Sequence, residues 1–203
     1  MKRAAIGVRM HSGWGAVVAV GAGAEGVEVL QRLRMVVSSR DVPGAVQPYH
    51  FAEKLKLEDA KQFLAERLAD STAIAGGIIE VLLNALADRQ YQVAGAAVAL
   101  AAGRPLPALE KILASHALIH TAEGVFFREV FAEACRKLGI AVTGLREREL
   151  AKCADEVFGK RASSIREQIA SMGRSIGPPW TSDQKTAALA GAIVLQQTDL
   201  RTD

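Results

Sequence analysis

Two histidines and a glutamate stand out because their spacing would bring them together on a helix. His116, His120 and Glu123 are separated by four and then three residues. Each residue of an α-helix advances by about 100°, so the three side chains share one face. Two imidazoles and a carboxylate form a ligand set suited to zinc or manganese. The spacing therefore predicts either a metal site or a hydrogen-bonded cluster in which a histidine pairs with the glutamate.

The same stripe of the helix carries large apolar side chains, namely Leu109, Ile112, Leu113, Phe127, Val130 and Phe131. A stripe of this kind packs against the rest of the protein. The sequence therefore predicts that both imidazoles and the carboxylate of Glu123 point inward, where polar groups are costly unless they are paired. In a hydrolase, one imidazole would act as a general base near neutral pH and Glu123 would orient it.

Three further residues are candidates for the same site. His11 ends the first expected strand, His50 ends the loop before the first long helix, and Asp183 lies in the first turn of the last helix. Strand ends and loops often carry functional residues, so we group these three with the helical cluster as candidate catalytic residues. Each also has an ordinary interpretation, since a surface histidine or an aspartate at a helix N-terminus needs no function. Trp14 and Trp180 lie in Gly- or Pro-rich turns and are candidates for lining a cleft.

Hydrophobic periodicity predicts the elements that must position these residues. Alternating apolar residues indicate strands, and apolar residues three or four apart indicate helices. The expected strands cover residues 6–10, 16–20, 27–37, 92–101 and 140–145, and the expected helices cover 57–86 (as one helix or two), 108–138, 147–158, 164–172 and 181–197. This order predicts an α/β protein with one mixed sheet of about five strands and helices on both faces, in a single domain spanning residues 1–203.

Composition excludes several classes of protein. Half of the 203 residues are apolar and 23% are charged, which is typical of an ordered domain rather than a disordered chain. The two cysteines, Cys135 and Cys153, form no CxxC pair and suit a reducing compartment. Arg9 and His11 interrupt any signal-like apolar run, and the apolar stretch 73–87 is shorter than the ~20 residues of a membrane span. We therefore expect a cytoplasmic protein that does not associate with a membrane.

The distribution of charge gives modest support for nucleic-acid binding. The net charge of +3 is too small for a general nucleic-acid coat. Residues 136–174, however, contain nine basic and five acidic residues. The candidates for phosphate contacts in this region are Lys160, Arg161, Arg166 and Arg174. A solvated helical face with paired charges is the alternative interpretation.

Three stretches and the order of the elements resemble the ribonuclease-H-like fold, and within it the Holliday-junction resolvases of the RuvC type. The stretch IGVRMHSGWG at 6–15 resembles the first hairpin of the resolvases. The stretch HTAEGVFFREVFAEACRKLGIAV at 120–142 is similar to a helix and the strand after it, and SDQKTAALAGAI at 182–193 is similar to the last helix. The resemblance covers most of the chain and implies a ribonuclease-H-like sheet.

The resemblance also implies about four carboxylates that hold two divalent cations, and here this chain departs from the pattern. Arg9 stands where the first-strand aspartate is expected, the stretch QVAGAAVALA contains no glutamate, and Thr186 replaces the second aspartate of the last helix. Asp183 alone matches. Because an arginine repels magnesium, the resemblance implies the fold without the usual two-metal nuclease site.

Three functions remain open from the sequence. The first is a degenerate member that binds nucleic acid or a protein without cutting. The second is a histidine-based, metal-dependent phosphoester hydrolase that uses the His116, His120 and Glu123 cluster with zinc or manganese. The third is a structural domain that forms a homodimer through the Ala-rich helix around residues 186–195.

Overall fold

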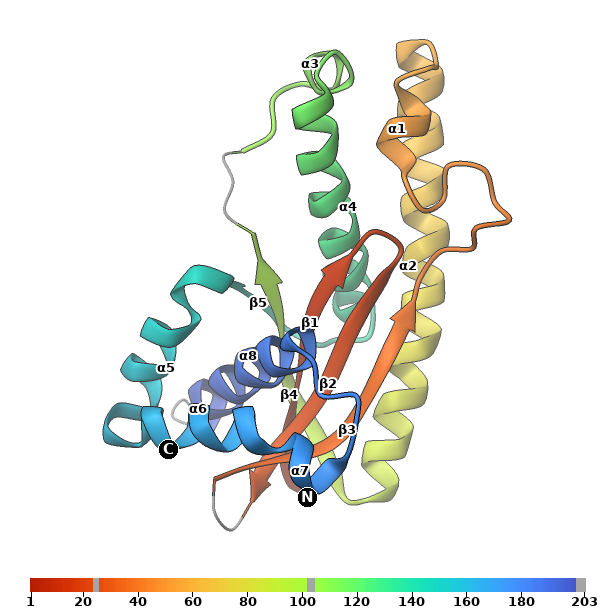
Figure 1. Cartoon of the computed structure of the whole chain (residues 1–203). Coiled ribbons are helices and arrows are strands. Elements are labelled where there is room, and N and C mark those ends of the chain that lie inside the picture. Colours follow the sequence, from red (N-terminus) through yellow and green to blue (C-terminus); the bar gives the residue numbers. More distant parts are fainter. Residues whose placement is uncertain (24–25, 102–104, 200–203) are drawn as a thin grey trace.

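The computed structural model describes residues 1–23, 26–101 and 105–199, and within them five strands form one mixed sheet (Figure 1). The strands are β1 (Lys2–His11), β2 (Trp14–Gly23), β3 (Gly26–Val36), β4 (Tyr91–Leu100) and β5 (Val142–Arg146), in the order β3-β2-β1-β4-β5. β1, β2 and β3 form an antiparallel meander, and β4 and β5 run parallel to β1. The predicted mixed sheet is confirmed.

Helices cover both faces of this sheet, as predicted. α2 (Leu57–Asp88) and α4 (His116–Lys137) cover one face, where they pack with Ile6 and Val8 of β1. The other face is covered by α5 (Leu150–Phe158), α6 (Ala162–Ser171) and α8 (Ser182–Asp199), with the short α7 (Gly173–Ile176) beside them (Figure 1). The alternation of side chains along β1 therefore directs Ile6 and Val8 to one layer and Gly7, Arg9 and His11 to the other.

The start of the predicted helix 108–138 is wrong. Leu109–Leu113 forms a separate short helix, α3, and Ser115 has an extended backbone (φ −139°, ψ 111°) before α4 begins. The chain turns there because Leu109 and Leu113 pack with α1 (Pro48–Ala52) and the start of α2 rather than with the sheet. α1 itself begins inside the segment expected to be a loop that ends at His50. Together α1, α3 and the first turns of α2 and α4 extend beyond the sheet (Figure 1), and we call this group the helical cap.

α8 approaches β1 more closely than ordinary side chains allow. A Cβ atom at Gly7 would overlap the carbonyl oxygen of Ala187 and lie 2.8 Å from the amide nitrogen of Gly191. Small residues on both elements therefore let the helix backbone rest on the strand. Ala187, Ala188 and Ala190 are fully buried by this packing. The small residues of this Ala-rich helix therefore serve a contact within the chain. The expected contact of the helix with a second subunit stays a prediction.

α2 is the one helix in the described part of the chain that is long and apolar enough to cross a membrane by length and composition. Its 32 residues form a single helix that passes through Gly76 and Gly77 without a break, so it is longer than the stretch considered in the sequence. Ala75, Ile79 and Leu82 pack in the core of the sheet. Length and composition are weak support for a span, because a core helix passes the same test.

We predict that Gly7→Ala lowers the free energy of unfolding by about 1–3 kcal/mol or more, because the added methyl group must push α8 away from β1. Urea unfolding of the purified chain measures this effect. Gly77→Ala is the matched control: nothing lies within 4 Å of a Cβ atom there, so the substitution should stabilise α2 by about 1 kcal/mol. An unchanged stability of Gly7→Ala would contradict the close packing.

Candidate functional site

Arg9, near the C-terminal end of β1, binds two carboxylates. Its Nε and Nη2 atoms each donate a hydrogen bond of 3.0 Å to one of the two carboxylate oxygens of Glu147. Its Nη1 atom donates to Oδ1 of Asp183. All three side chains are partly buried, with 29%, 34% and 18% of the Arg9, Glu147 and Asp183 side chains exposed. The guanidinium group therefore holds together the ends of three different elements.

Two local features place these carboxylates. Glu147 begins a 3-10 turn, η1 (Glu147–Glu149), directly after β5. Asp183 lies in the first turn of α8, where the side-chain oxygen of Gln184 accepts a hydrogen bond of 2.8 Å from the backbone N–H of Thr181. This bond is half of a capping box, of which the sequence TSDQ at 181–184 is typical, and it fixes where the helix starts. The close packing at Gly7 then brings the start of α8 to the end of β1.

Aromatic and basic side chains continue from Asp183 across the sheet. The Nε2 atom of His11 lies 3.1 Å from Oδ2 of Asp183. The His11 ring stacks on Trp14 with 4.3 Å between centroids and 12° between planes. The guanidinium carbon of Arg34 lies 3.9 Å from the centroid of the Trp14 ring. We call these six residues the charged row, in the order Glu147, Arg9, Asp183, His11, Trp14 and Arg34.

The charged row favours the ionised forms of its central groups. Hydrogen bonding to Glu147 raises the pKa of Arg9 above its usual value, although burial opposes the shift and the bond to Asp183 adds to it. Burial alone would raise the pKa of Asp183, but the hydrogen bond from Arg9 and the neighbouring His11 side chain hold the pKa below its usual value. The arginine and this aspartate are therefore both charged across the physiological range.

Three of the four histidines meet in the helical cap, away from the charged row. The Nε2 atoms of His116 and His120 lie 3.0 Å apart on successive turns of α4. The ring of His50, on α1, lies with its centroid 5.5 Å from that of His116 and 4.8 Å from that of His120. We call these three residues the histidine cluster. His11 belongs instead to the charged row, so the four histidines do not converge.

Glu123 lies behind the histidine cluster and is 3% exposed. Its Oε1 atom accepts hydrogen bonds from the backbone N–H groups of Tyr49 (2.9 Å) and His50 (3.2 Å), and it lies 3.1 Å from Nδ1 of His50. Burial raises the pKa of Glu123 above 4.5, and the bonds from His50 and Tyr49 oppose that shift. The carboxylate thus connects α4 to the backbone and the side chain of α1.

The prediction that both imidazoles of α4 point inward is wrong. His116 and His120 are exposed, whereas Glu123 and the phenylalanines further along the helix are buried. The cause is the length of α4, whose first turns extend past the sheet into the helical cap (Figure 1). The apolar stripe is real, but the core ends before it reaches the two histidines.

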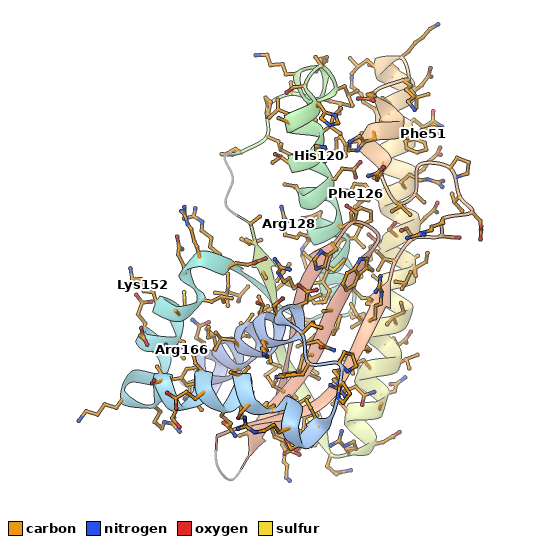
Figure 2. The ribbon with its side chains drawn as sticks, viewed as in Figure 1. Phe51, His120, Phe126, Arg128, Lys152 and Arg166 are labelled. Atoms are coloured by element: carbon orange, nitrogen blue, oxygen red, sulfur yellow. The ribbon has the colours of Figure 1, made fainter. Side chains whose placement is uncertain are left out.

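A groove of about 480 Å³ lies between α4 and the end of β4. His120, Thr121, Gly124 and Arg128 line it from α4. Figure 2 shows Arg128 further along α4 than His120, toward the sheet. Burial lowers the pKa of Arg128, and the nearby charge of Glu147 opposes that shift. Arg128 therefore brings a positive charge into the groove, between the histidine cluster and the charged row.

The other predicted site residues lie elsewhere. Arg161 and Arg174 line hollows beside Gly21 and Gly23, at the end of the sheet opposite His11. Lys160 is exposed next to Arg161, and Arg166 forms an ion pair with Asp155. Trp180 packs on Gly173 and donates a hydrogen bond of 2.7 Å to the carbonyl of Ile169. None of these five basic and aromatic side chains joins the charged row or the histidine cluster.

Comparison with known proteins identifies the fold. No family model matches the chain, and no curated protein matches it. Thermus thermophilus RuvC is 12% identical, with 98% of this chain and 97% of that chain covered and a TM-score of 0.54. The T. thermophilus RuvC structure in complex with a Holliday junction substrate is 13% identical, with 98% and 96% covered and a TM-score of 0.56. The chain has the ribonuclease-H-like fold. The resemblance inferred from the sequence is thereby confirmed at the level of fold.

The residues at the end of β1 do not fit the two divalent cations that the ribonuclease-H-like fold implies. The guanidinium of Arg9 already satisfies both oxygens of Glu147 and one of Asp183. A cation bound between these carboxylates would lie against a positive charge that cannot be neutralised. The second oxygen of Asp183 faces His11. Arg9 therefore stands in place of a metal rather than beside one.

Sequence reasoning missed Glu147, Arg34 and Arg128. Glu147 had a usable signal, because it directly follows a parallel strand and ligand sites gather at the carboxyl ends of such strands. Arg34 and Arg128 had none, since an arginine on a strand or a helix is usually an ordinary surface residue. His50 was a candidate, but 66 residues separate it from His116, so their contact depends on the helical cap.

We predict that Glu123→Gln removes a pH-dependent part of the stability of metal-free protein. Because the folded-state pKa lies above 4.5, the folded state retains its proton longer than the unfolded chain. The contribution of Glu123 to stability is therefore fully present below pH 4.5 and decreases as the pH rises through the folded-state pKa. Urea unfolding of the wild type and of Glu123→Gln, in the presence of a chelator and over a series of pH values, gives the difference in the free energy of unfolding as a function of pH. Glu58→Gln on the exposed surface is the control. The same pH dependence of the stability change in both variants would contradict the prediction.

A second prediction concerns Arg9→Asp, which replaces the guanidinium by a carboxylate. Without metal, the ion pairs are lost and like charges meet, so we expect a loss of about 1–3 kcal/mol in stability. Manganese should restore it: at 100 times the Kd, mass action adds about 2.7 kcal/mol, or roughly 5–11 °C in the melting temperature of a chain this size. Thermal melts with and without manganese measure the change. Arg34→Asp is the control, and a wild-type chain stabilised as strongly as Arg9→Asp would contradict our account of Arg9.

Proposed function

We propose that this protein binds nucleic acid through a ribonuclease-H-like domain that does not cleave by the two-metal mechanism. The observation that carries the proposal is Arg9, whose guanidinium binds Glu147 and Asp183 where the fold implies cations. A guanidinium neutralises the carboxylates but cannot activate water or coordinate a phosphodiester as a Lewis acid. The site retains its order and its shape without the means for that reaction.

The choice of nucleic acid as the partner is supported by the fold and by the surface beside Arg9. A structure of the same fold, T. thermophilus RuvC, is in complex with a Holliday junction substrate. In this chain, the exposed guanidinium of Arg34 is held over Trp14, and Arg128 lines a groove at the same end of the sheet. Basic groups fixed by aromatic or helical packing are suited to phosphate contacts, because less side-chain freedom is lost on binding.

A second candidate surface for nucleic-acid binding lies on the helices at the opposite end of the sheet. It consists of Lys160, Arg161, Arg166 and Arg174. We favour the charged row because it combines fixed cations with aromatic rings. The ion pair between Arg166 and Asp155 also leaves the second surface with fewer free cations. The two surfaces are far enough apart in the fold to be tested separately.

A phosphoester hydrolase is the second candidate function. The observation that favours it is the groove in which His120 and Arg128 occur together, since an imidazole and a guanidinium can activate and bind a phosphoester. Its test is turnover of a simple phosphodiester by zinc-loaded protein. His120→Ala should abolish that turnover, and equal turnover by both proteins would exclude the cluster as its source.

We predict salt-dependent binding of a labelled four-way DNA junction without cleavage in magnesium or manganese. Fluorescence anisotropy measures the affinity, and gel electrophoresis detects any cut strand. Arg34→Ala should weaken binding and reduce the slope of log affinity against log salt by about 1, as expected for one lost phosphate contact.

Arg174→Ala is the matched control, because it also removes an exposed arginine but lies at the opposite end of the sheet. The proposal expects it to bind like the wild type. If Arg174→Ala loses affinity for DNA and Arg34→Ala does not, the binding surface lies at α6 and α7 instead. Absence of binding at low salt to junction, duplex and single strand would overturn the proposed function.

A further inference from the structure

We propose that His50, His116 and His120 form a binding site for one zinc ion, with Glu123 as the residue that positions His50. The site joins α1 to α4 in the helical cap and shares no residue with the charged row. It does not depend on the proposed nucleic-acid function. The sequence alone suggested Glu123 as a direct ligand; we infer that His50 is the third ligand and that Glu123 acts through it.

The three imidazoles have a suitable arrangement. One ligand nitrogen from each histidine lies within 4.8 Å of the others, and those of His116 and His120 are 3.0 Å apart. Nitrogens around a tetrahedral zinc ion are about 3.3 Å apart, because each Zn–N bond is about 2.0–2.1 Å long. His116 and His120 are exposed, so small rotations of their rings can close the remaining gap without disturbing the core.

Glu123 gives His50 the tautomer that a metal ligand needs. Its Oε1 atom is fixed by two backbone N–H groups, those of Tyr49 and His50, and faces Nδ1 of His50. An Nδ1–H group that donates to this carboxylate leaves the lone pair on Nε2 free for a metal. Histidine ligands of zinc commonly have such a partner, which orients the ring and increases its basicity.

The ligand types favour zinc over magnesium. Imidazole nitrogens bind zinc and similar transition metals, whereas magnesium and calcium require oxygen ligands that this cluster does not offer. Three protein ligands also leave a fourth position for water or a ligand, as in zinc enzymes. His120 lines the groove that holds Arg128, and His50 lines a second hollow with Arg40 and Lys54. The surroundings would therefore favour an anionic ligand at that position.

Without a metal, the same geometry would be a hydrogen bond between His116 and His120 beside an ion pair of His50 with Glu123. The two arrangements differ in what they predict. A hydrogen-bonded cluster binds no zinc and changes little when cobalt is added. A metal site takes up one ion per chain and loses affinity in a defined order as ligands and the positioning residue are removed.

The test is calorimetric titration of the full, tag-free chain with zinc, together with visible absorption after addition of cobalt, which absorbs strongly when tetrahedral. We expect one zinc ion per chain. Glu123→Gln should weaken binding by about 10- to 100-fold, the usual effect of losing an orienting partner, and His120→Ala should weaken it further. His120→Ala and His116→Ala change exposed residues, so the test does not depend on whether Glu123→Gln folds.

His11→Ala is the matched control, since it removes the one histidine outside the cluster. It should bind zinc like the wild type and give the same cobalt spectrum. Failure of the wild type to bind zinc stoichiometrically would overturn the site. So would an equal loss of affinity in His11→Ala and His120→Ala. Both readouts use metal alone, so their outcome is separate from that of the nucleic-acid measurements.

Discussion

The arrangement of the charged row depends on the close approach of α8 to β1. Gly7 has no side chain, and Ala187 and Gly191 face it, so the helix backbone lies directly on the central strand. This contact fixes where α8 begins, and therefore where Asp183 lies. A larger helix-to-sheet spacing would move Asp183 away from Arg9 and His11. A packing constraint in the core thus sets the geometry of polar groups at the end of the sheet.

Arg9 balances the carboxylates that gather at the end of the sheet. Carboxylates gathered at the end of a sheet repel one another and need a positive partner. In the usual two-metal site that partner is exchangeable and acts as a Lewis acid. Here it is a covalently attached guanidinium with a raised pKa, so it is always present and always charged. Glu147 and Asp183 therefore have a permanent positive partner within the chain.

The histidine cluster belongs to a different part of the structure. It lies where α1 and α4 meet beyond the sheet. The buried carboxylate of Glu123 joins His50 to α4, and Tyr49 of α1 packs on the buried Ile119 and Ala122 of α4. Arg128 lies on α4 between the cluster and the charged row, and its pKa responds to the charge of Glu147. Arg128 therefore lines the same groove as His120 and is also near enough to Glu147 to respond to its charge.

The sequence determined the sheet, the helices on both faces and the start of α8, because each depends on local periodicity or capping. It also determined that an arginine stands at position 9, near the end of the first strand. It could not determine which polar groups meet. The partnership of Arg9 with Glu147 spans 138 residues, and that of His50 with Glu123 spans 73. The inward prediction for His116 and His120 failed because helical spacing defines a face but not where the core ends. These outcomes were decided by tertiary packing, since α8 and the helical cap bring distant segments together through contacts that no local pattern encodes.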